Sequence, residues 1–302
     1  MVYLHENREE FANAINLASE YFRVLPIIVE KDYYVTMILR ELSHRQEFIV
    51  FKGGTSLSKC HKAIKRFSED IDITIDSKLT QGQMKKLKES IKEIAEKIGL
   101  TIPNIDETRS RRSYNRYILE YKSVLSEPDE AVQTAVLMET SFAEVSFPTV
   151  MLSVHSYIGD MMEEEAPEEL ENFCLNPFEM KVQGIDRTLA DKVFAICDYY
   201  MQNRVKKHSR HIYDIYKLLQ LVPQTDEFKT LVKEVRSVRA MTNICPSANP
   251  DVNVPEMLNF LVENEVYRAD YENVTVRILE EDVGYDVAIE AIKKIAASGI
   301  FE

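Results

Sequence analysis

Apolar residues recur at two different spacings in the first 185 residues. Phe11, Ile15 and Phe22 are four and seven positions apart, which is typical of one helix face and predicts a helix over 8–23. Comparable patterns predict helices over 27–43, 55–67 and 83–98. Short apolar or alternating runs predict strands over 47–51, 69–76, 114–121, 132–142 and 179–185. A Glu-Pro-Asp loop is expected at 127–129, and a glutamate-rich, solvated segment at 161–171.

From Asp186 onward the pattern is helical throughout. Leu189, Val193 and Ile196 define the apolar face of the first predicted helix, and Thr188 is a candidate capping residue. Further helical patterns cover 211–221, 226–239, 255–265 and 285–297. The change of pattern indicates a boundary near residue 185. We therefore expect an α+β fold with a mixed domain over 1–185 and a helical domain over 186–302.

The composition narrows the class of protein. The chain has 302 residues, of which 45% are hydrophobic and 29% charged, as is typical of soluble globular proteins. The net charge of −13 excludes an evenly basic surface for duplex DNA, but it leaves room for a local basic cleft. Four separated cysteines without a Cys-x-x-Cys spacing argue against a zinc or redox motif and favour a reducing compartment. The polar N-terminus and the short apolar runs predict a cytoplasmic protein without membrane segments.

Asp70 and Asp72 stand two positions apart in the alternating run EDIDITID. In a strand such residues project from one face, about 7 Å apart, while the intervening isoleucines face the other side. Two neighbouring carboxylates repel each other unless a cation lies between them, and hard oxygen ligands suit Mg²⁺. The alternation alone also fits a half-exposed strand with a polar outer face. An EF-hand does not fit, because the run lacks the loop glycine.

Gly53 and Gly54 follow a predicted strand in a chain with only 8 glycines. With Thr55, Ser56 and a helix after them, they can let backbone N–H groups approach a phosphate. The segment is not a Walker A loop, because Cys60 follows Lys59 where Ser or Thr is required. A purely structural turn is the alternative. The turn ends 16 residues before Asp70, and the combination favours phosphate chemistry with a metal ion.

At this point the sequence resembles the AbiEii/AbiGii-type nucleotidyltransferase toxins, which belong to the DNA polymerase β-like nucleotidyltransferase superfamily. The matching segments are GGTSLSK at 53–59, RFSEDID at 66–72, TLADK at 188–192, RHIYDIYKL at 210–218 and, near the N-terminus, EKDYYV at 30–35. The match runs from about residue 30 to about residue 220. The resemblance implies a polymerase β-like mixed sheet flanked by helices, with a C-terminal helical bundle lobe.

The resemblance also implies an activity, the transfer of a nucleoside monophosphate from an NTP with release of pyrophosphate. Asp70 and Asp72 would bind Mg²⁺, with Mn²⁺ as the alternative metal. A third metal-binding carboxylate, usual on a neighbouring strand in the superfamily, is placed at Glu139, with Glu144 as its rival. The residues expected to hold the β- and γ-phosphates are Gly53, Gly54, Thr55 and Ser56.

The helical domain is expected to contribute two further residues to the cleft. Lys192 would bind the nucleotide and neutralise charge on the leaving pyrophosphate. Asp214 is expected to orient Lys192 or Arg210, with direct assistance to the nucleophile or substrate as the alternative. Two roles remain open for Arg66, binding phosphate or pairing with a carboxylate. Two also remain open for Ser68, contacting phosphate or ending the loop before the strand. Lys31 and Asp32 either line the cleft or pair along the surface of their helix.

Basic residues gather in three segments despite the acidic total. They are Lys59, Lys62, Lys65 and Arg66; Arg109, Arg111, Arg112 and Arg116; and Arg204, Lys206, Lys207, His208 and Arg210. If they converge they would attract a polynucleotide backbone, and Tyr114 and Tyr117 would stack an exposed base. We expect an RNA acceptor, with tRNA favoured by the resemblance, and a toxin of a toxin–antitoxin or phage-defence system with an antitoxin or co-encoded repressor as partner. Two alternatives remain: an inactive nucleotide-sensing or protein-interaction module, and an enzyme that modifies a protein hydroxyl or a small molecule.

Overall fold

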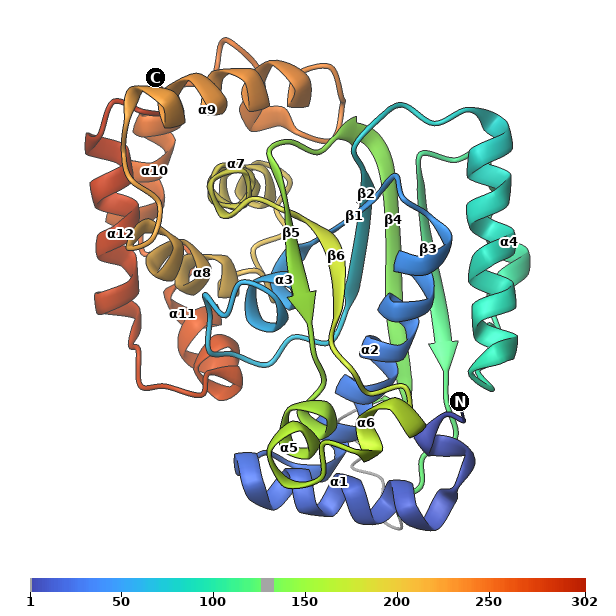
Figure 1. The fold of residues 1–302 in the computed structure, drawn as a ribbon. Helices are drawn as coiled ribbons and strands as arrows, with labels where there is room; N and C mark the ends of the chain where they lie inside the picture. Colours follow the sequence, from blue (N-terminus) through green and yellow to red (C-terminus); the bar gives the residue numbers. More distant parts are fainter. Residues whose placement is uncertain (1, 126–132) are drawn as a thin grey trace. The chain divides into compact units, whose positions relative to one another are not determined.

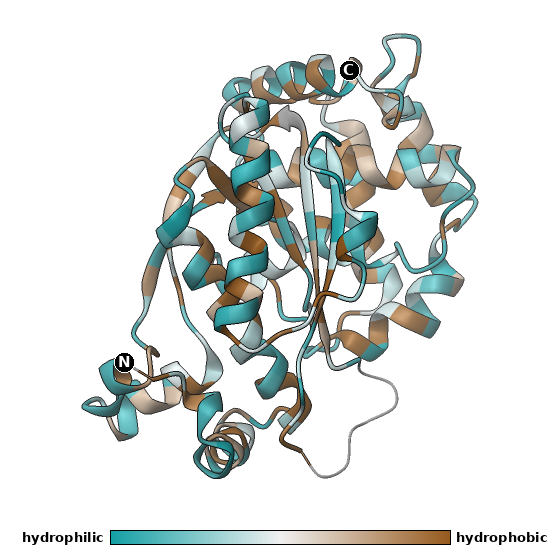
Figure 2. Cartoon of the chain, turned by 90° about the vertical axis from the view of Figure 1, so that its right-hand side faces the viewer, coloured by the Kyte–Doolittle hydropathy of each residue, from teal (hydrophilic) through white to brown (hydrophobic). Residues whose placement is uncertain are grey.

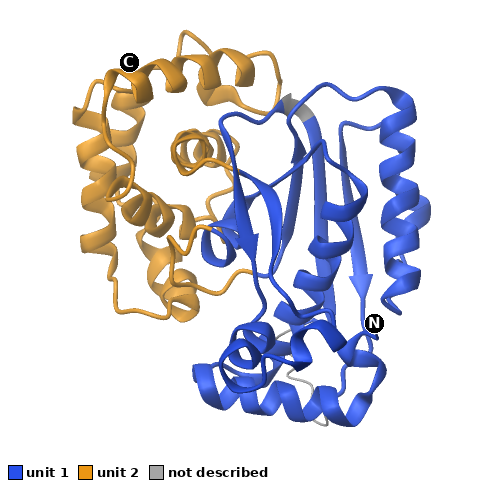
Figure 3. Ribbon diagram, in the orientation of Figure 1, with its two compact units in different colours: residues 1–60, 69–182 blue, residues 61–68, 183–302 orange. Residues whose placement is uncertain are grey.

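A computed structural model describes residues 2–125 and 133–302, apart from the side chains of residues 143 and 144. The chain divides into two compact units, which Figure 3 shows in different colours. Unit 1 comprises residues 1–60 and 69–182, and unit 2 comprises residues 61–68 and 183–302. The chain therefore leaves unit 1 after Cys60 and returns to it at Glu69. The loop predicted at 127–129 lies outside the described residues.

A six-stranded mixed sheet forms the centre of unit 1 (Figure 1). In order across the sheet the strands are β3 (Tyr114–Glu120), β4 (Ala135–Val145), β2 (Ile71–Ile75), β1 (Ile49–Lys52), β6 (Phe178–Gln183) and β5 (Thr149–Val154). β1 is antiparallel to β2 and parallel to β6, whereas β4 is parallel to β2 and antiparallel to β3. The expected mixed sheet flanked by helices is confirmed.

The sequence patterns predict five of these strands and miss β5. This strand lies at the edge of the sheet, and Val150 and Met151 are adjacent and both exposed, so its apolar residues do not alternate between two faces. The segment at 161–171, expected to be solvated, is largely exposed, with only Met161 and Leu170 buried among its residues, but most of it is helical. Part of it lies in α5 (Tyr157–Glu165), which Ser156 caps and whose Ile158 and Met161 are buried, and part in the short helix α6 (Glu169–Asn172).

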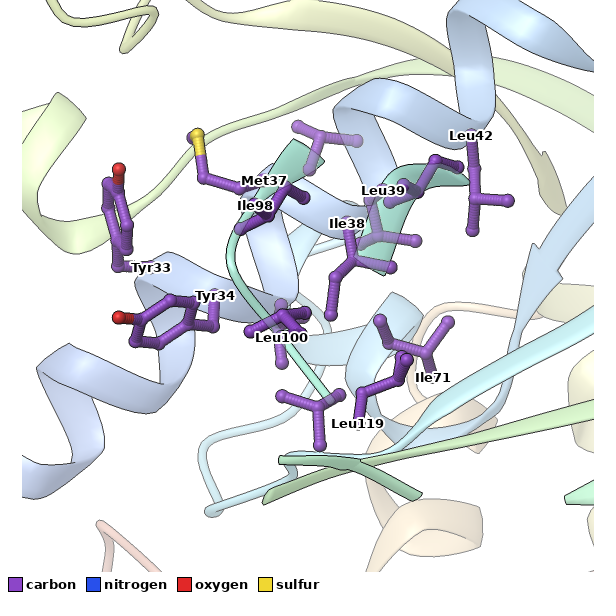
Figure 4. Packing of buried hydrophobic residues seen from close by; sticks show 14 of the residues in the cluster. Tyr33, Tyr34, Met37, Ile38, Leu39, Leu42, Ile71, Ile98, Leu100 and Leu119 are labelled. Atoms are coloured by element: carbon purple, nitrogen blue, oxygen red, sulfur yellow. The ribbon is translucent and has the colours of Figure 1, made fainter. Parts of the chain in front are cut away.

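The helices of unit 1 pack mainly through α2. Besides α5 and α6, they are α1 (Arg8–Phe22), α2 (Pro26–Arg45), α3 (Gly53–Lys59) and α4 (Gln81–Lys97). Figure 4 shows Tyr33, Tyr34, Met37 and Ile38 of α2 in one buried cluster with Ile71 and Leu119 of the sheet and with Ile98 and Leu100. α2 is therefore a core helix and a rigid support for the strands.

α4 shows the ordinary amphipathic pattern. Thr80 caps its first turn by accepting from the Gln83 backbone N–H, and Leu87, Ile91 and Ile94 form its buried stripe. In the view of Figure 2, α4 lies on the side toward the viewer, and hydrophilic residues predominate on the outer side of this helix. The chain leaves it through Gly99, whose φ of +72° is the left-handed conformation common after a helix.

α3 is much shorter than the helix predicted over 55–67. It ends at Lys59, and residues 61–68 belong to unit 2. There the backbone N–H of Phe67 donates to the Ile278 carbonyl, and that of Glu280 donates to the Lys65 carbonyl. The segment thus forms hydrogen bonds with a distant part of the chain instead of continuing a helix. Local apolar spacing carries no information about such a long-range partner.

Unit 2 is helical. Its helices are α7 (Ile185–Met201), α8 (Arg210–Leu219), α9 (Asp226–Arg239), α10 (Val254–Glu263), α11 (Arg268–Asp270) and α12 (Tyr285–Ala297). The hydroxyl of Thr188 donates to the Gly184 carbonyl, so Thr188 lies inside α7 rather than capping it. A π-helical turn at Tyr271–Thr275 falls in a stretch for which no helix is predicted. Within the described ranges, no helix combines the length and apolar character that spanning a bilayer requires.

Candidate active site

The turn after β1 depends on glycine at Gly53. Its φ of +82° lies in the left-handed region, and a Cβ placed on it would overlap the carboxylate of Asp72. The buried hydroxyl of Ser56 donates to the Gly53 carbonyl at 2.9 Å and fixes the turn from inside. Thr55 is also buried, whereas Gly54 is half-buried. The glycine turn and Asp72 are therefore in direct contact within unit 1.

A row of four charged residues crosses the sheet beside this turn. Asp72 of β2 lies opposite Lys52 of β1 and opposite Glu139 of β4, and Glu139 lies opposite Arg116 of β3. Residues directly opposite each other on paired strands share a face. The order across the sheet is therefore Arg116, Glu139, Asp72, Lys52, so that a cation flanks each side of the two carboxylates.

The other face of β2 is apolar, as the alternation predicts. Ile71, Ile73 and Ile75 are each at most 1% exposed, whereas Asp72 is half-buried. Asp70 directly precedes the strand and is also half-buried. The aspartates thus do not point into the core.

Glu139 has close partners on the neighbouring strand. Arg116 donates from Nε at 2.9 Å and from Nη2 at 2.5 Å to the same oxygen, Oε1. The hydrogen bond with Glu139 raises the pKa of Arg116. Burial, together with a hydrogen bond to Glu139, raises the pKa of Tyr114 to about 12. The rival third carboxylate, Glu144, has a side chain outside what the structure describes.

The donor set of unit 1 fits a divalent cation. Asp70, Asp72 and Glu139 offer carboxylate oxygens, the ligands that Mg²⁺ prefers. Gly53 lies against the Asp72 carboxylate where any larger residue would displace it. A metal ion beside the row would relieve the repulsion between neighbouring carboxylates.

Unit 2 holds the other two predicted residues in one buried cluster. Asp214 of α8 is fully buried, and its Oδ2 accepts from Lys192 Nζ of α7 at 2.6 Å. Arg66 binds the same carboxylate in a bidentate manner, donating from Nε to Oδ1 at 2.7 Å and from Nη2 to Oδ2 at 2.8 Å. His211 Nδ1 lies 3.3 Å from Lys192 Nζ. The structure thus gives Asp214 two cationic partners, Lys192 and Arg66.

The electrostatics of this cluster follow from burial and close charges. Burial alone would raise the pKa of Asp214, but the positive charges of Arg66 and Lys192 outweigh it, so the pKa lies well below its usual range. Burial lowers the pKa of Lys192, and Asp214 opposes that shift. Burial and the nearby Lys192 charge lower the pKa of His211 well below its usual value. Asp214 is therefore a fixed anion and His211 a neutral ring.

Several basic or aromatic residues that were expected to contact a nucleic acid are buried or paired within the protein. Tyr117 is buried on the core side of β3 and cannot stack an exposed base, whereas Tyr114 is 45% exposed. Lys59 and Arg66 are engaged in buried ion pairs, with Asp32 and Asp214 respectively. Neither lies on a solvated basic surface.

Another group of potential metal ligands, missed by sequence analysis, lies in unit 1. Ligand atoms of His155, Asp160 and Glu163 are all within 4.8 Å of one another. His155 Nδ1 is 2.9 Å from Asp160, and its Nε2 is 2.9 Å from the Ser153 hydroxyl. Both ring nitrogens therefore have protein partners, and the group ties β5 to α5. No spacing motif in the sequence marks it.

Comparisons with known proteins agree with the fold and the motifs. The family model described as "Nucleotidyl transferase AbiEii toxin, Type IV TA system" matches residues 38–291. A search of curated proteins finds no match. Among solved structures, the MenT4 nucleotidyltransferase toxin from Mycobacterium tuberculosis is similar, with a TM-score of 0.55 and 16% identity over 94% of this chain and 88% of that one. The structural likeness supports the fold, and the family match covers most of the sequence. The chain therefore belongs to the AbiEii family of nucleotidyltransferase toxins of type IV toxin–antitoxin systems.

Proposed function

We propose that the chain transfers a nucleoside monophosphate from an NTP to RNA, with tRNA as the favoured acceptor, in a reaction that depends on Mg²⁺. Family membership supplies the activity class, the NTP substrate and an antitoxin partner. The observation that carries the proposal is the contact between Gly53 and Asp72 beside the row that contains Glu139. In this contact the backbone N–H groups proposed to bind phosphate lie next to the carboxylate oxygens proposed to bind the metal, on the neighbouring strands β1, β2 and β4.

In this proposal Asp70, Asp72 and Glu139 hold the metal. A bound divalent ion supplies charge neutralisation on the triphosphate and lowers the pKa of an attacking hydroxyl. Arg116 holds the Glu139 carboxylate in place by donating to its Oε1. Mn²⁺ presents the same ligand preferences and is expected to substitute.

The glycine turn is proposed to hold the β- and γ-phosphates. The backbone N–H groups of Gly53 and Gly54 are the donors, with Thr55 beside them. Ser56 contributes by fixing the Gly53 carbonyl, because its own hydroxyl is buried in that hydrogen bond. The absence of a Cβ at Gly53 keeps the turn against Asp72.

Lys192 is proposed to serve the same reaction from the helical unit, which spans residues 183–302 together with 61–68. Its ammonium would bind the nucleotide and neutralise charge on the leaving pyrophosphate. Asp214 holds Lys192 through the 2.6 Å contact and opposes the lowering of its pKa by burial. Because Asp214 is a strongly stabilised anion with two cations on it, orienting Lys192 suits it better than accepting a proton from the acceptor.

An exposed basic segment beside the row supports an RNA acceptor. Arg109, Arg111 and Arg112 are exposed in the loop before β3, and Tyr114 at the start of β3 is partly exposed. Arg116 links this segment to Glu139. Guanidinium groups contact phosphates, and an exposed tyrosine ring stacks on an unpaired base.

The test is nucleotide incorporation by the purified full chain. Each NTP, labelled on its α-phosphate, is incubated with Mg²⁺ and either total tRNA or total protein. We expect label in tRNA, and none with the Asp72→Ala variant. Label in protein alone would favour hydroxyl modification of proteins. NTP binding without transfer to either fraction would favour the sensing module.

A further inference from the structure

Three consecutive charged residues of α2 are buried or largely buried. Glu30 is fully buried, Lys31 is 2% exposed, and the side chain of Asp32 is 16% exposed. Burying a charge is costly unless a partner and further hydrogen bonds compensate it. α2 already packs through its apolar residues, so these charges need another explanation (Figure 4).

Asp32 ties α2 to the helix that follows the glycine turn. Its Oδ1 accepts from Lys59 Nζ at 2.5 Å, and its Oδ2 accepts from the Tyr157 backbone N–H at 2.9 Å. Lys59 also donates to the His155 carbonyl at 2.6 Å. Lys59 is the last residue of α3, whose first residue is Gly53. The contact thus anchors the far end of the helix that carries the phosphate turn.

Lys31 ties the same turn of α2 to the aspartate segment. Its Nζ lies 2.7 Å from Glu69 Oε2 and donates to the Gln133 carbonyl at 3.1 Å. Glu69 directly precedes Asp70 and is the residue at which the chain returns to unit 1. Gln133 leads into β4, the strand of Glu139. Lys31 therefore contacts the beginnings of both segments that supply proposed metal ligands.

We propose that Lys31 and Asp32 are positioning residues of the transfer reaction. Asp32 holds the phosphate turn through Lys59, and Lys31 holds the metal-binding segment through Glu69. The chain leaves unit 1 after Cys60, which follows Lys59, and re-enters at Glu69, so the two ion pairs hold the chain on both sides of that excursion. A single turn of a core helix thereby fixes the position of the phosphate turn relative to the metal-binding segment. This inference rests on the proposed roles of Gly53, Asp70 and Asp72.

The two ion pairs predict different defects, which a general loss of stability would not produce. Lys31→Gln is expected to raise the Mg²⁺ concentration for half-maximal transfer about tenfold, because Asp70 and its neighbours lose their support. Asp32→Asn is expected to raise the KM for NTP about tenfold, because α3 and its turn lose theirs. In both variants kcat is expected to fall by a smaller factor than the rise in the Mg²⁺ requirement of Lys31→Gln or in the KM for NTP of Asp32→Asn.

Glu30→Gln is the matched control. Glu30 sits in the same helical turn and is fully buried, but it accepts from the Ser123 hydroxyl at 2.7 Å and the Val124 backbone N–H at 2.8 Å. Its variant is expected to melt at a lower temperature while keeping the metal requirement and the NTP KM of the native chain. Glu69→Gln removes the same ion pair by changing Glu69, the more exposed of the two partners. It replaces Lys31→Gln in the experiment if that variant does not fold.

The experiment measures melting temperature, transfer kinetics over a range of Mg²⁺ and NTP, and binding of Mn²⁺ by electron paramagnetic resonance and of a non-hydrolysable NTP by calorimetry. Weaker Mn²⁺ binding in Lys31→Gln or Glu69→Gln and weaker NTP binding in Asp32→Asn, relative to Glu30→Gln, supports the inference. Binding and kinetics equal to those of Glu30→Gln overturn it. If the native chain transfers no nucleotide, the proposed function fails, and the two binding measurements still decide the positioning roles.

Discussion

Two aspartates of this chain, Asp72 and Asp214, have opposite environments. Asp72 is half-buried on a sheet face, next to another carboxylate and in contact with a glycine. Asp214 is fully buried inside the helical unit and is bound by the fork of Arg66 and by Lys192. In the proposed function, the first provides an oxygen-rich face for a metal ion and phosphates. The second has its charge satisfied inside the protein, and in the proposed function it acts through Lys192, which it holds.

The difference predicts how stability and activity separate. A carboxylate placed for a metal stabilises little by itself, because neighbouring anions repel it. A carboxylate that neutralises two buried cations supports both the fold and the orientation of those cations. Variants at the two positions are therefore expected to lose activity together and to lose stability differently.

The largest effect is expected for Asp72→Ala. Loss of a metal ligand removes several kcal/mol of charge stabilisation from the transition state, or about 10³-fold or more in transfer rate. The melting temperature is expected to stay close to that of the native chain. The incorporation assay and thermal unfolding measure both, with Asp76→Asn as control, since Asp76 pairs with Lys181 at the other end of the strand. Retention of a tenth of the native activity by Asp72→Ala would contradict its assignment.

Asp214→Asn is expected to lose both properties. It leaves Arg66 and Lys192 buried without their counter-charge, which costs about 3–5 kcal/mol of unfolding free energy, and transfer falls about 10²-fold because Lys192 is no longer oriented. Urea unfolding and the incorporation assay give the two numbers. Asp286→Asn removes a surface partner of Arg268 and is expected to change neither. A fully stable Asp214→Asn variant would argue against the buried ion-pair cluster.

Gly53→Ala tests the contact that links the turn to Asp72. Gly53 and Gly99 both have positive φ, so alanine costs about 1–2 kcal/mol at either position. Only at Gly53 does the added Cβ meet the Asp72 carboxylate, since open space surrounds Gly99. We expect similar melting temperatures for the two variants and at least about a tenfold lower transfer rate for Gly53→Ala alone. Equal rates in both variants would remove the turn from the site.

Local patterns predict the part of the site that local sequence builds. The alternation around Asp70 and Asp72 fixes which residues of β2 face the core, and the Gly-Gly pair marks a turn that only glycine permits. The family motifs add Lys192 and Asp214, which the structure places in contact. The strand faces, the turn and the Lys192–Asp214 contact are predictable because each depends on residues a few positions apart or on a recognised motif, while the roles of these residues stay predictions.

Partners that are distant in sequence are not predictable in this way. Arg66 binds Asp214 across 148 positions, and Lys31 reaches Glu69 from a core helix. Of the two alternatives for Lys31 and Asp32, lining the cleft or pairing along the surface of their helix, their burial argues against the second. The same reason explains the short α3, because the chain after Lys59 finds hydrogen bonds with residues 278–280 that no local pattern shows.

The smallest expected effect concerns the pH dependence of stability near the buried cluster. His208 stacks on Tyr199 with ring centroids 3.6 Å apart, and burial together with Arg210 and Arg204 lowers its pKa to about 4. The unfolded chain therefore takes up a proton first, so this contribution to stability is complete above about pH 6.5 and is lost as the pH falls toward 4. His208→Phe keeps the stacking and removes the titration. Between pH 7.5 and 5.0 we expect the melting temperature of the native chain to fall a few degrees further than that of the variant. Because both proteins retain His5, His61 and His211, whose pKa values are also lowered, an equal fall in the two would assign the acid sensitivity to those histidines and to carboxylates instead.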